Sequence, residues 1–330
     1  MSKKQKKIRI VAAFFITGFL LCLMFLLAVN TGSLNVSGKQ LWEGLFVAFD
    51  ETVAAVYHLR FPRIVISIFI GGALAVSGVL LQAVLRNPLT DPGVIGITGG
   101  AALTGVIFTA IFPGLLGMIP IASCIGGITA FLLVYSLSWK GGLSPLRIVL
   151  VGVAASTMFS GVLNAFNTLS GERLSGVAAI VEGNITAKTW TDVRIIVYYL
   201  PIALILALCF TGKCNLLALD DKTARGIGLN VDRYRLLISL VAVVLASVST
   251  AVAGSVSFVG LLVPHIGRIF VGSNHKVLIP YSFLLGALLF LSADTVGRMI
   301  APPYEVNASI IMAVIGGPFF IVLLKRRANI

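Results

Sequence analysis

Ten apolar segments, most of them about 20 residues long, alternate with short polar stretches along this 330-residue chain. Hydrophobic residues make up 58% of the sequence and charged residues only 11%, whereas soluble domains carry about 25% charged residues. A backbone in lipid must satisfy its own hydrogen bonds, so segments of this length predict transmembrane helices, and the alternation typical of barrel strands is absent. The sequence therefore predicts an all-α polytopic membrane protein, a single transmembrane domain over residues 1–330. Its helices are expected at 8–29, 62–84, 94–112, 118–138, 146–168, 192–212, 235–254, 256–270, 279–299 and 306–324.

The N-terminal segment is interpreted as the first membrane helix. It begins MSKKQKKIRI, and the apolar run after it is too long for a signal peptide and lacks an A-x-A cleavage site, so a cleaved signal is the less favoured alternative. With this basic end in the cytoplasm, the predicted topology places 18 of the 25 Lys and Arg residues on the cytoplasmic side. Both chain ends are then cytoplasmic. Membrane orientation accounts for the basic excess, which requires no nucleic-acid partner.

Neither catalysis nor a bound cofactor is indicated. The four cysteines form no CxxC pair, and the three histidines are far apart in the sequence, so no disulfide framework or metal site is expected. The nucleotide-binding pattern GxxxxGK[ST] and the catalytic patterns HExxH and GxSxG are missing. A membrane-embedded enzyme is therefore disfavoured.

Carboxylates are nearly absent from the apolar segments. Only Asp294 lies well within one, and Arg298 follows one helical turn later, where the two charges can neutralise each other. We expect Asp294 to be structural. A transporter driven by protons or sodium usually keeps ionisable groups at mid-membrane, so an ion-coupled secondary transporter is the second choice. The energy for transport is expected to come from outside this chain.

The fifth predicted span carries a polar stripe. Ser156, Ser160, Asn164 and Asn167 recur at intervals that place them on one helix face. Asparagines facing lipid would be costly, so this face should meet protein or water. It predicts a wet translocation pathway, or equally a packing face supported by Gly152 and Gly161.

The stretch Lys213–Arg235 holds eight charged residues between two apolar segments. Asp220 can cap a short helix there, and Gly226 or Gly228 can supply the left-handed residue that ends it. Such a helix is a plausible contact for a soluble partner, although a solvated loop explains the charge equally well.

Several motifs in the expected order resemble the FecCD-type permeases, the type II ABC importers of bacterial iron-siderophore, haem and cobalamin uptake. The first block, LRFPRIVISIFIGGALAVSGVLLQAVLRNPLTDPGVIGITGG, matches R-x-P-R, a glycine-rich helix ending in Gln, R-N-P-L-x-x-P and G-I-x-x-G. The second, GSVSFVGLLVPHIGR, is similar to G-x-x-x-F-V-G-L-x-x-P-H-x-x-R. The third combines Asp294 and Arg298 with GGPFF near the C-terminus. The resemblance covers nearly the whole chain.

The resemblance implies a transmembrane permease of the bacterial cytoplasmic membrane. It implies a second permease subunit, identical or paralogous, two separate ATPase subunits, and an extracytoplasmic solute-binding lipoprotein. The family's docking arginines correspond to Arg60, Arg63 and Arg298, and our topology also places these on the outer side. The charged stretch corresponds to the family's ATPase-coupling segment, so Asp220, Asp221, Arg225 and Gly228 are the expected coupling residues.

Two departures from the family pattern concern local shape. Asp220-Asp221-Lys222 stands where Gly-Asp-Glu is usual, and Tyr304–Ser309 lacks the proline and glycine of the usual E-x-P-V-G-I. The residues do not specify the transported ligand. A ferric siderophore is expected because it is the commonest substrate in the family, with haem or cobalamin as alternatives.

Overall fold

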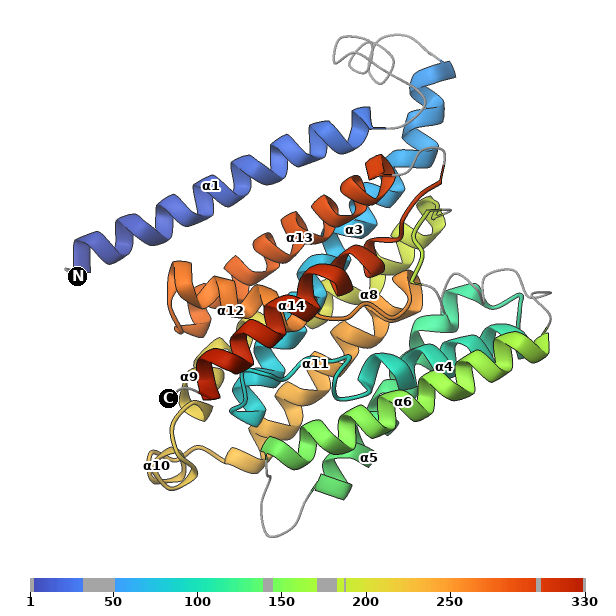
Figure 1. The fold of residues 1–330 in the computed structure, drawn as a ribbon. Helices are drawn as coiled ribbons and strands as arrows, with labels where there is room; N and C mark the ends of the chain where they lie inside the picture. Colours follow the sequence, from blue (N-terminus) through green and yellow to red (C-terminus); the bar gives the residue numbers. More distant parts are fainter. Residues whose placement is uncertain are drawn as a thin grey trace.

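The computed structural model describes residues 3–31, 51–138, 145–170, 183–186, 188–300 and 304–328, and it is built from helices (Figure 1). Ten of the helices in these ranges correspond one to one with the ten predicted spans. They are α1 (Lys3–Asn30), α3 (Glu51–Leu85), α4 (Ile97–Ile111), α5 (Ile119–Ser138), α6 (Pro145–Ser170), α8 (Trp190–Cys209), α11 (Val231–Ala253), α12 (Val259–Val271), α13 (His275–Ile300) and α14 (Ala308–Ala328). The remaining three are short: η1 (Leu116–Met118), α9 (Thr211–Leu217) and α10 (Asp221–Gly226).

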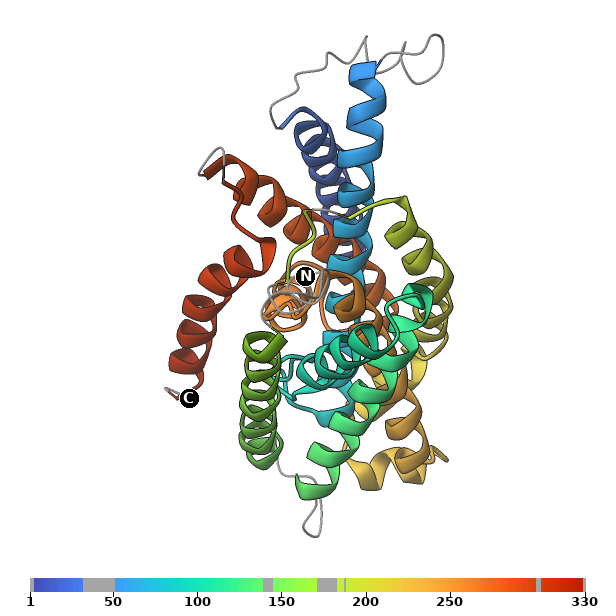
Figure 2. The same ribbon diagram turned by 90° about the vertical axis from the view of Figure 1, so that its right-hand side faces the viewer.

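Helix α3 is the central element of the bundle. Figures 1 and 2 show it running the length of the molecule, and it packs against α1, α8, α11, α12 and α13. Its apolar segment is largely buried, whereas those of α1 and α6 are mostly exposed. A helix surrounded by protein need not present an apolar face to lipid, which explains why α3 can be rich in small residues.

Glycines allow α3 to approach its neighbours at backbone distance. A Cβ on Gly71 would lie 2.3 Å from the carbonyl oxygen of Gly286 in α13, and a Cβ on Gly78 would lie 2.0 Å from that of Gly260 in α12. Helices in lipid gain little from hydrophobic association, so close packing through small residues supplies much of their attraction. These glycines belong to the glycine-rich motif of the second predicted span.

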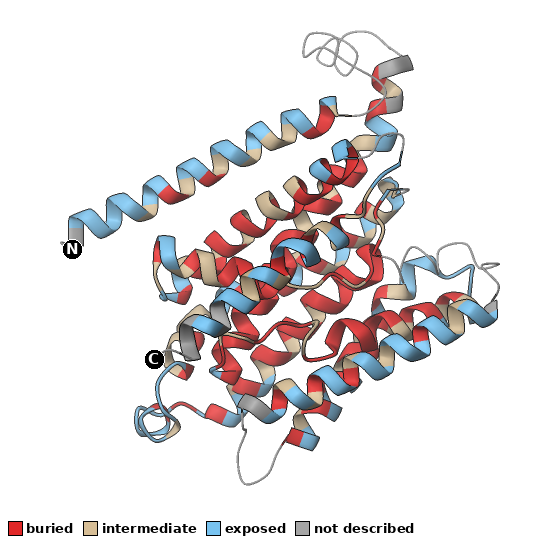
Figure 3. Cartoon of the chain, viewed as in Figure 1, coloured by how far each residue is buried: buried red, intermediate tan, exposed pale blue. Residues whose placement is uncertain are grey.

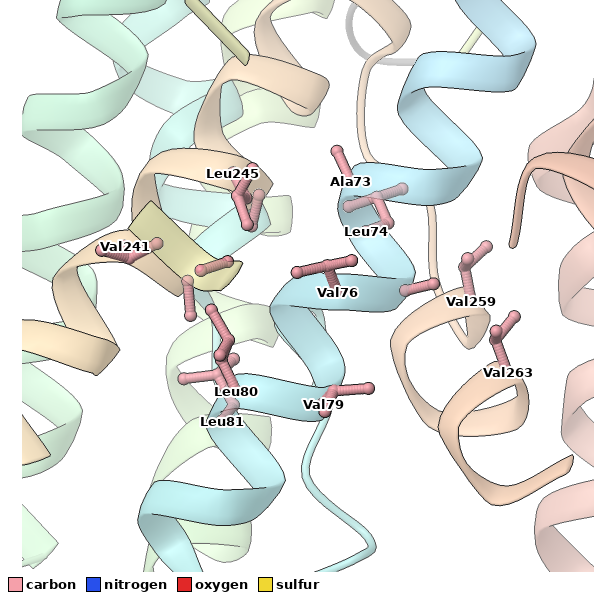
Figure 4. Close-up of a cluster of buried hydrophobic side chains, with 14 of the residues drawn as sticks. Ala73, Leu74, Val76, Val79, Leu80, Leu81, Val241, Leu245, Val259 and Val263 are labelled. Atoms are coloured by element: carbon pink, nitrogen blue, oxygen red, sulfur yellow. The ribbon is translucent and has the colours of Figure 1, made fainter. Parts of the chain in front are cut away.

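The apolar core lies between α3, α11 and α12. Figure 4 shows Ala73, Leu74, Val76, Val79, Leu80 and Leu81 of α3 beside Val241 and Leu245 of α11 and Val259 and Val263 of α12. All of these side chains are buried. Their close packing adds dispersion contacts that lipid tails would make less well.

Apolar side chains also cover much of the outside. Figure 3 shows exposed residues along α1, α6 and α14, and they include Phe15, Leu150, Val162 and Val314. Large apolar residues on the surface of a soluble protein would indicate an interface. Here they are what a lipid-facing surface requires.

Two of the membrane helices are short and begin inside the molecule. Helix α4 follows the loop of residues 86–96, and α12 follows a non-helical stretch that ends at Phe258, whose φ is +69°. Asn87, Thr90 and Asp91 in the first loop are buried. Non-helical backbone at membrane depth is tolerated where protein surrounds it, and this condition is met here.

We expect Gly78→Ala to destabilise the permease strongly. The added methyl group would overlap the backbone of Gly260, and overpacking of this kind typically costs about 1–3 kcal/mol. Unfolding of the purified protein in mixed micelles measures the change. Gly18→Ala in α1 is the matched control, because nothing lies within 4 Å of the Cβ it would add. Equal stability of the two variants would contradict the close packing.

Candidate functional site

The charged stretch after α8 forms two short helices, α9 and α10, and so is not simply a loop. The Asp220 carboxylate accepts a hydrogen bond from the backbone N–H of Thr223 at 3.1 Å and thereby caps α10. Hydrogen bonds with the side chain and then the backbone N–H of Thr223 lower the pKa of Asp220 below its ordinary value. Asp220 therefore has a capping role where the family usually has glycine.

The end of α10 is formed by Gly228 and not by Gly226. Gly228 has φ +84°, and the N–H groups of Gly228 and Leu229 donate to the carbonyls of Arg225 and Ala224 at 2.9 and 3.1 Å. This pairing is the Schellman arrangement, in which glycine is favoured because a side chain would strain the left-handed backbone. Both ends of the predicted helix are thus formed by residues that the sequence had nominated.

The other two candidate coupling residues point in different directions. Asp221 forms ion pairs with Arg86 at the end of α3 and with Arg235 of α11, the latter at 2.9 Å. Burial raises the pKa of Asp221, but the hydrogen bond and charge of Arg235 and the charge of Arg86 outweigh burial and lower it. Arg225 pairs with the exposed Asp232, at 2.9 Å, and remains 57% exposed. Asp221 anchors α10 to the bundle, whereas Arg225 is presented to the outside.

A buried ionic cluster joins α3 to the C-terminal part of α13. Arg63 Nε donates to both carboxylate oxygens of Asp294, at 2.9 and 3.1 Å, and Arg63 Nη1 donates to Glu305 at 2.6 Å. Asp294 is completely buried. The sequence paired Asp294 with Arg298, but that contact is longer, at 3.5 Å, and Arg63 is the principal partner. The pairing with Arg63 joins residues 231 positions apart, so helical spacing could not reveal it.

The three candidate docking arginines all make contacts within the chain. Arg298 is buried and donates to the carbonyls of Thr31 and Ala28, at 3.0 and 3.1 Å. Arg60 is half-buried and donates to the carbonyl of Val29 at 2.6 Å. The cluster therefore fastens the end of α1 to α3 and α13. Arg60 is the most accessible of the three.

The polar stripe of α6 does not have a single environment. Ser156 is half-buried and donates to the carbonyl of Gly93 at 2.8 Å, in the loop before α4. Ser160 and Asn164 are exposed, and Asn167 is half-buried. Figure 2 shows α6 and α14 at the same edge of the molecule, where they form an outer surface. The stripe begins at a contact within the chain and continues onto that surface.

Sequence reasoning overlooked Asp91. It lies in the R-N-P-L-x-x-P motif, is buried, and accepts a hydrogen bond from the backbone N–H of Gly93 at 2.8 Å. Its other carboxylate oxygen lies against α12, 2.9 Å from where a Cβ on Gly260 would be. Its position between the predicted spans 62–84 and 94–112 made it resemble an ordinary loop carboxylate. The two prolines around it, Pro88 and Pro92, were the available signal for a defined backbone.

Metal coordination finds no support in the part of the chain that the structure describes. No group of three or more His, Cys, Asp or Glu side chains there is placed to hold an ion. His265 lies near the ring of Phe319, with 5.6 Å between the ring centroids. His275 is buried and interacts with Asn215 through Nδ1 at 2.8 Å.

The family model for the FecCD transport family matches residues 20–326. The chain belongs to the FecCD transport family. Two *Staphylococcus aureus* relatives, from strains Newman and MW2, are each 40% identical to this FecCD permease over 92% of the chain and 94% of their own length. Both bear the name "Probable heme-iron transport system permease protein IsdF".

Solved structures support the same fold. A metal-chelate type ABC transporter in an inward-facing conformation matches with a TM-score of 0.80 and 28% identity, over 96% of this chain and 99% of the other. PsaBC from *Streptococcus pneumoniae* matches with a TM-score of 0.55 and 19% identity, over 86% and 94% of the two chains, and shares the fold alone. The FecCD permease therefore has the type II ABC importer fold and is a multi-pass protein of the bacterial cytoplasmic membrane. It is a transmembrane subunit without catalytic activity.

We expect Asp294→Leu to destabilise the permease by about 3–5 kcal/mol, because it leaves Arg63 buried without its main counterion. The double variant Arg63→Met with Asp294→Leu should recover part of this loss, since it removes both buried charges. Unfolding of the three proteins in mixed micelles tests the pair. A double variant less stable than either single variant would contradict a mainly ionic role.

Proposed function

We propose that this FecCD permease carries haem iron into the cell. The observation that supports this most directly is the 40% identity, over nearly the full length, to permeases named for heme-iron transport. The sequence motifs alone favoured a ferric siderophore because of its prevalence in the family. The relatives favour the haem alternative instead.

The exposed face of α6 is compatible with such a ligand. Ser160 and Asn164 offer hydrogen-bonding groups, and the exposed apolar Val153 lies on the same side of the helix. Haem combines a large apolar ring with two charged propionates, so a pathway for it needs both kinds of surface. We infer that the stripe of Ser156, Ser160, Asn164 and Asn167 lines the path in the assembled transporter.

Growth on defined iron sources tests the substrate. A strain lacking its own copy of this gene and other haem importers should regain growth on haemin, as the sole iron source, when the permease is returned with its partner subunits. A panel of ferric siderophores provides the comparison. Restored growth on a siderophore without restored growth on haemin would reject haem as the substrate.

We propose that the ATPase subunits drive transport by acting on α10. ABC importer permeases work with ATPase subunits and a binding protein, and we propose two ATPase subunits, a second permease subunit and an extracytoplasmic lipoprotein. The exposed Arg225 offers a charged contact on the short helix that Asp220 and Gly228 terminate, and Asp221 fastens that helix to α3 and α11. Because α10 is held in this way, its displacement by the ATPase would be transmitted to α3 and α11.

The docking of the binding protein is proposed to involve Arg60, Arg63 and Arg298. Arg60 requires the least rearrangement, because it is half-buried and donates to a single carbonyl. Arg63 is already held by Asp294 and Glu305, so a partner's carboxylate would have to take the place of Glu305. Burial and the Arg63 ion pair act in opposite directions on Glu305, and the pair prevails and lowers its pKa. Glu305 therefore stays ionised and competes for Arg63.

We expect Arg60→Glu to reduce uptake at least tenfold while the ATPase still co-purifies, because a reversed charge repels the binding protein's carboxylates. Arg194→Glu is the matched control, since Arg194 is exposed near the start of α8 on the same predicted side. Uptake and binding-protein capture by the purified complex are the measurements. Equal uptake by the two variants would reject a docking role for Arg60.

A further inference from the structure

The loop of residues 86–96, here called the α3–α4 loop, is held at both ends and in the middle by side chains of other elements. It is buried for most of its length, with Asn87, Thr90 and Asp91 all less than 10% exposed. Internal hydrogen bonds fix its shape, among them Leu89 N–H to the Asn87 side chain at 3.0 Å. Such a loop behaves as a rigid connector.

The first end of the loop is joined to the two short helices α9 and α10. Arg86 has φ +49°, a conformation that is uncommon and costly for residues other than glycine. In this conformation Arg86 Nε donates to the carbonyl of Leu217 in α9 at 2.7 Å, and its guanidinium also pairs with Asp221 of α10. Contacts with both short helices support the strained backbone, so a displacement of α10 acts directly on the start of the loop.

The middle of the loop is joined to α12. Gln82 donates from its amide nitrogen to the carbonyls of Thr90 and Gly260, at 3.2 and 3.1 Å, and accepts from Arg268 at 2.5 Å. Asp91 accepts a hydrogen bond from the Gly93 N–H of its own loop at 2.8 Å. Its other carboxylate oxygen lies against the first turn of α12, 2.9 Å from where a Cβ on Gly260 would be. A carboxylate beside the first turn of a helix is stabilised by the helix dipole.

The far end is joined to α6. Ser156 donates to the carbonyl of Gly93 at 2.8 Å. A Cβ on Gly152, one helical turn earlier, would lie 2.5 Å from the carbonyl oxygen of Val94. The loop and α6 are therefore in backbone contact at the start of the polar stripe.

We propose that the α3–α4 loop transmits the movement of α10 to α6, with Arg86, Asp91 and Ser156 as positioning residues. The inference rests on the proposed coupling role of α10 and pathway role of α6. Separating these elements would leave buried polar groups without partners, so they move together more readily than apart. A route through α11 alone, by way of Arg235 and Asp221, would bypass Ser156, which makes the two routes distinguishable.

The test follows the accessibility of a cysteine on the stripe. Asn164→Cys is placed in a permease whose four native cysteines are replaced by alanine, and the permease is assembled with its ATPase and binding protein. Labelling by a membrane-impermeant methanethiosulfonate is compared without nucleotide and after trapping with ATP and vanadate. In this parent protein we expect the labelling rate to change at least about fivefold between the two states.

Ser156→Ala and Asp91→Asn should each reduce that change to less than about twofold while ATP hydrolysis continues. Thr157→Val is the control for Ser156→Ala, because its hydroxyl bonds only the carbonyl of Val153 in the same helix. Asp192→Asn is the control for Asp91→Asn, because Asp192 also accepts a backbone N–H, that of Thr189, but at the start of α8. Both controls should retain the full change.

A full nucleotide-dependent change in Ser156→Ala would overturn the inference, even if Asp91→Asn fails to assemble. Loss of the change in the two controls as well would also overturn it, because the effect would then not depend on the loop. A parent protein whose labelling ignores nucleotide would instead refute the proposed coupling and pathway, and the inference with them. Failure of haem uptake alone leaves this measurement valid, since no haem is needed for it.

Discussion

Backbone contact between α3 and its neighbours is the constraint on which the rest of the structure depends. Gly71 meets Gly286 and Gly78 meets Gly260 at distances that no side chain would permit. These contacts place α12 and α13 directly against α3. Arg63 in the N-terminal half of α3 and Arg86 just beyond its C-terminal end are about 35 Å apart along a continuous helix. Both candidate sites are therefore built on the same element.

Charge inside this protein is tolerated only where several partners surround it. Asp294 is neutralised chiefly by Arg63, and Arg298 bonds two carbonyls of the α1 end in addition to its longer contact with Asp294. Removal of one member of such a group strongly lowers the stability of the folded protein. A single exposed pair such as Arg225–Asp232 contributes little to that stability. A carboxylate held by two arginines is suited to fastening helices. It is poorly suited to the reversible proton or ion binding that a secondary transporter needs.

Two buried non-helical segments, before α4 and before α12, connect helices of the bundle to one another. The loop before α4 lies among other helices, and the side chains of Gln82 and Asp91 satisfy backbone groups of this loop and, for Gln82, of the first turn of α12. The membrane forbids such segments at the lipid surface. Their burial brings α9, α10, α12 and the polar stripe of α6 into one connected network.

The sequence by itself determined the class, the ten helices and their order. The length of each apolar segment and the basic residues beside it are local properties of the chain, and they decide how each segment inserts into a membrane. It also determined the ends of α10, since Asp220 and Gly228 act within a few residues of their own position. Only the tertiary structure decided that Arg63 is the partner of Asp294, that Asp221 faces Arg86 and Arg235, and that Ser156 is bonded to the loop before α4. These pairs join residues far apart in the chain, and which of them meet depends on helix packing that no single segment encodes.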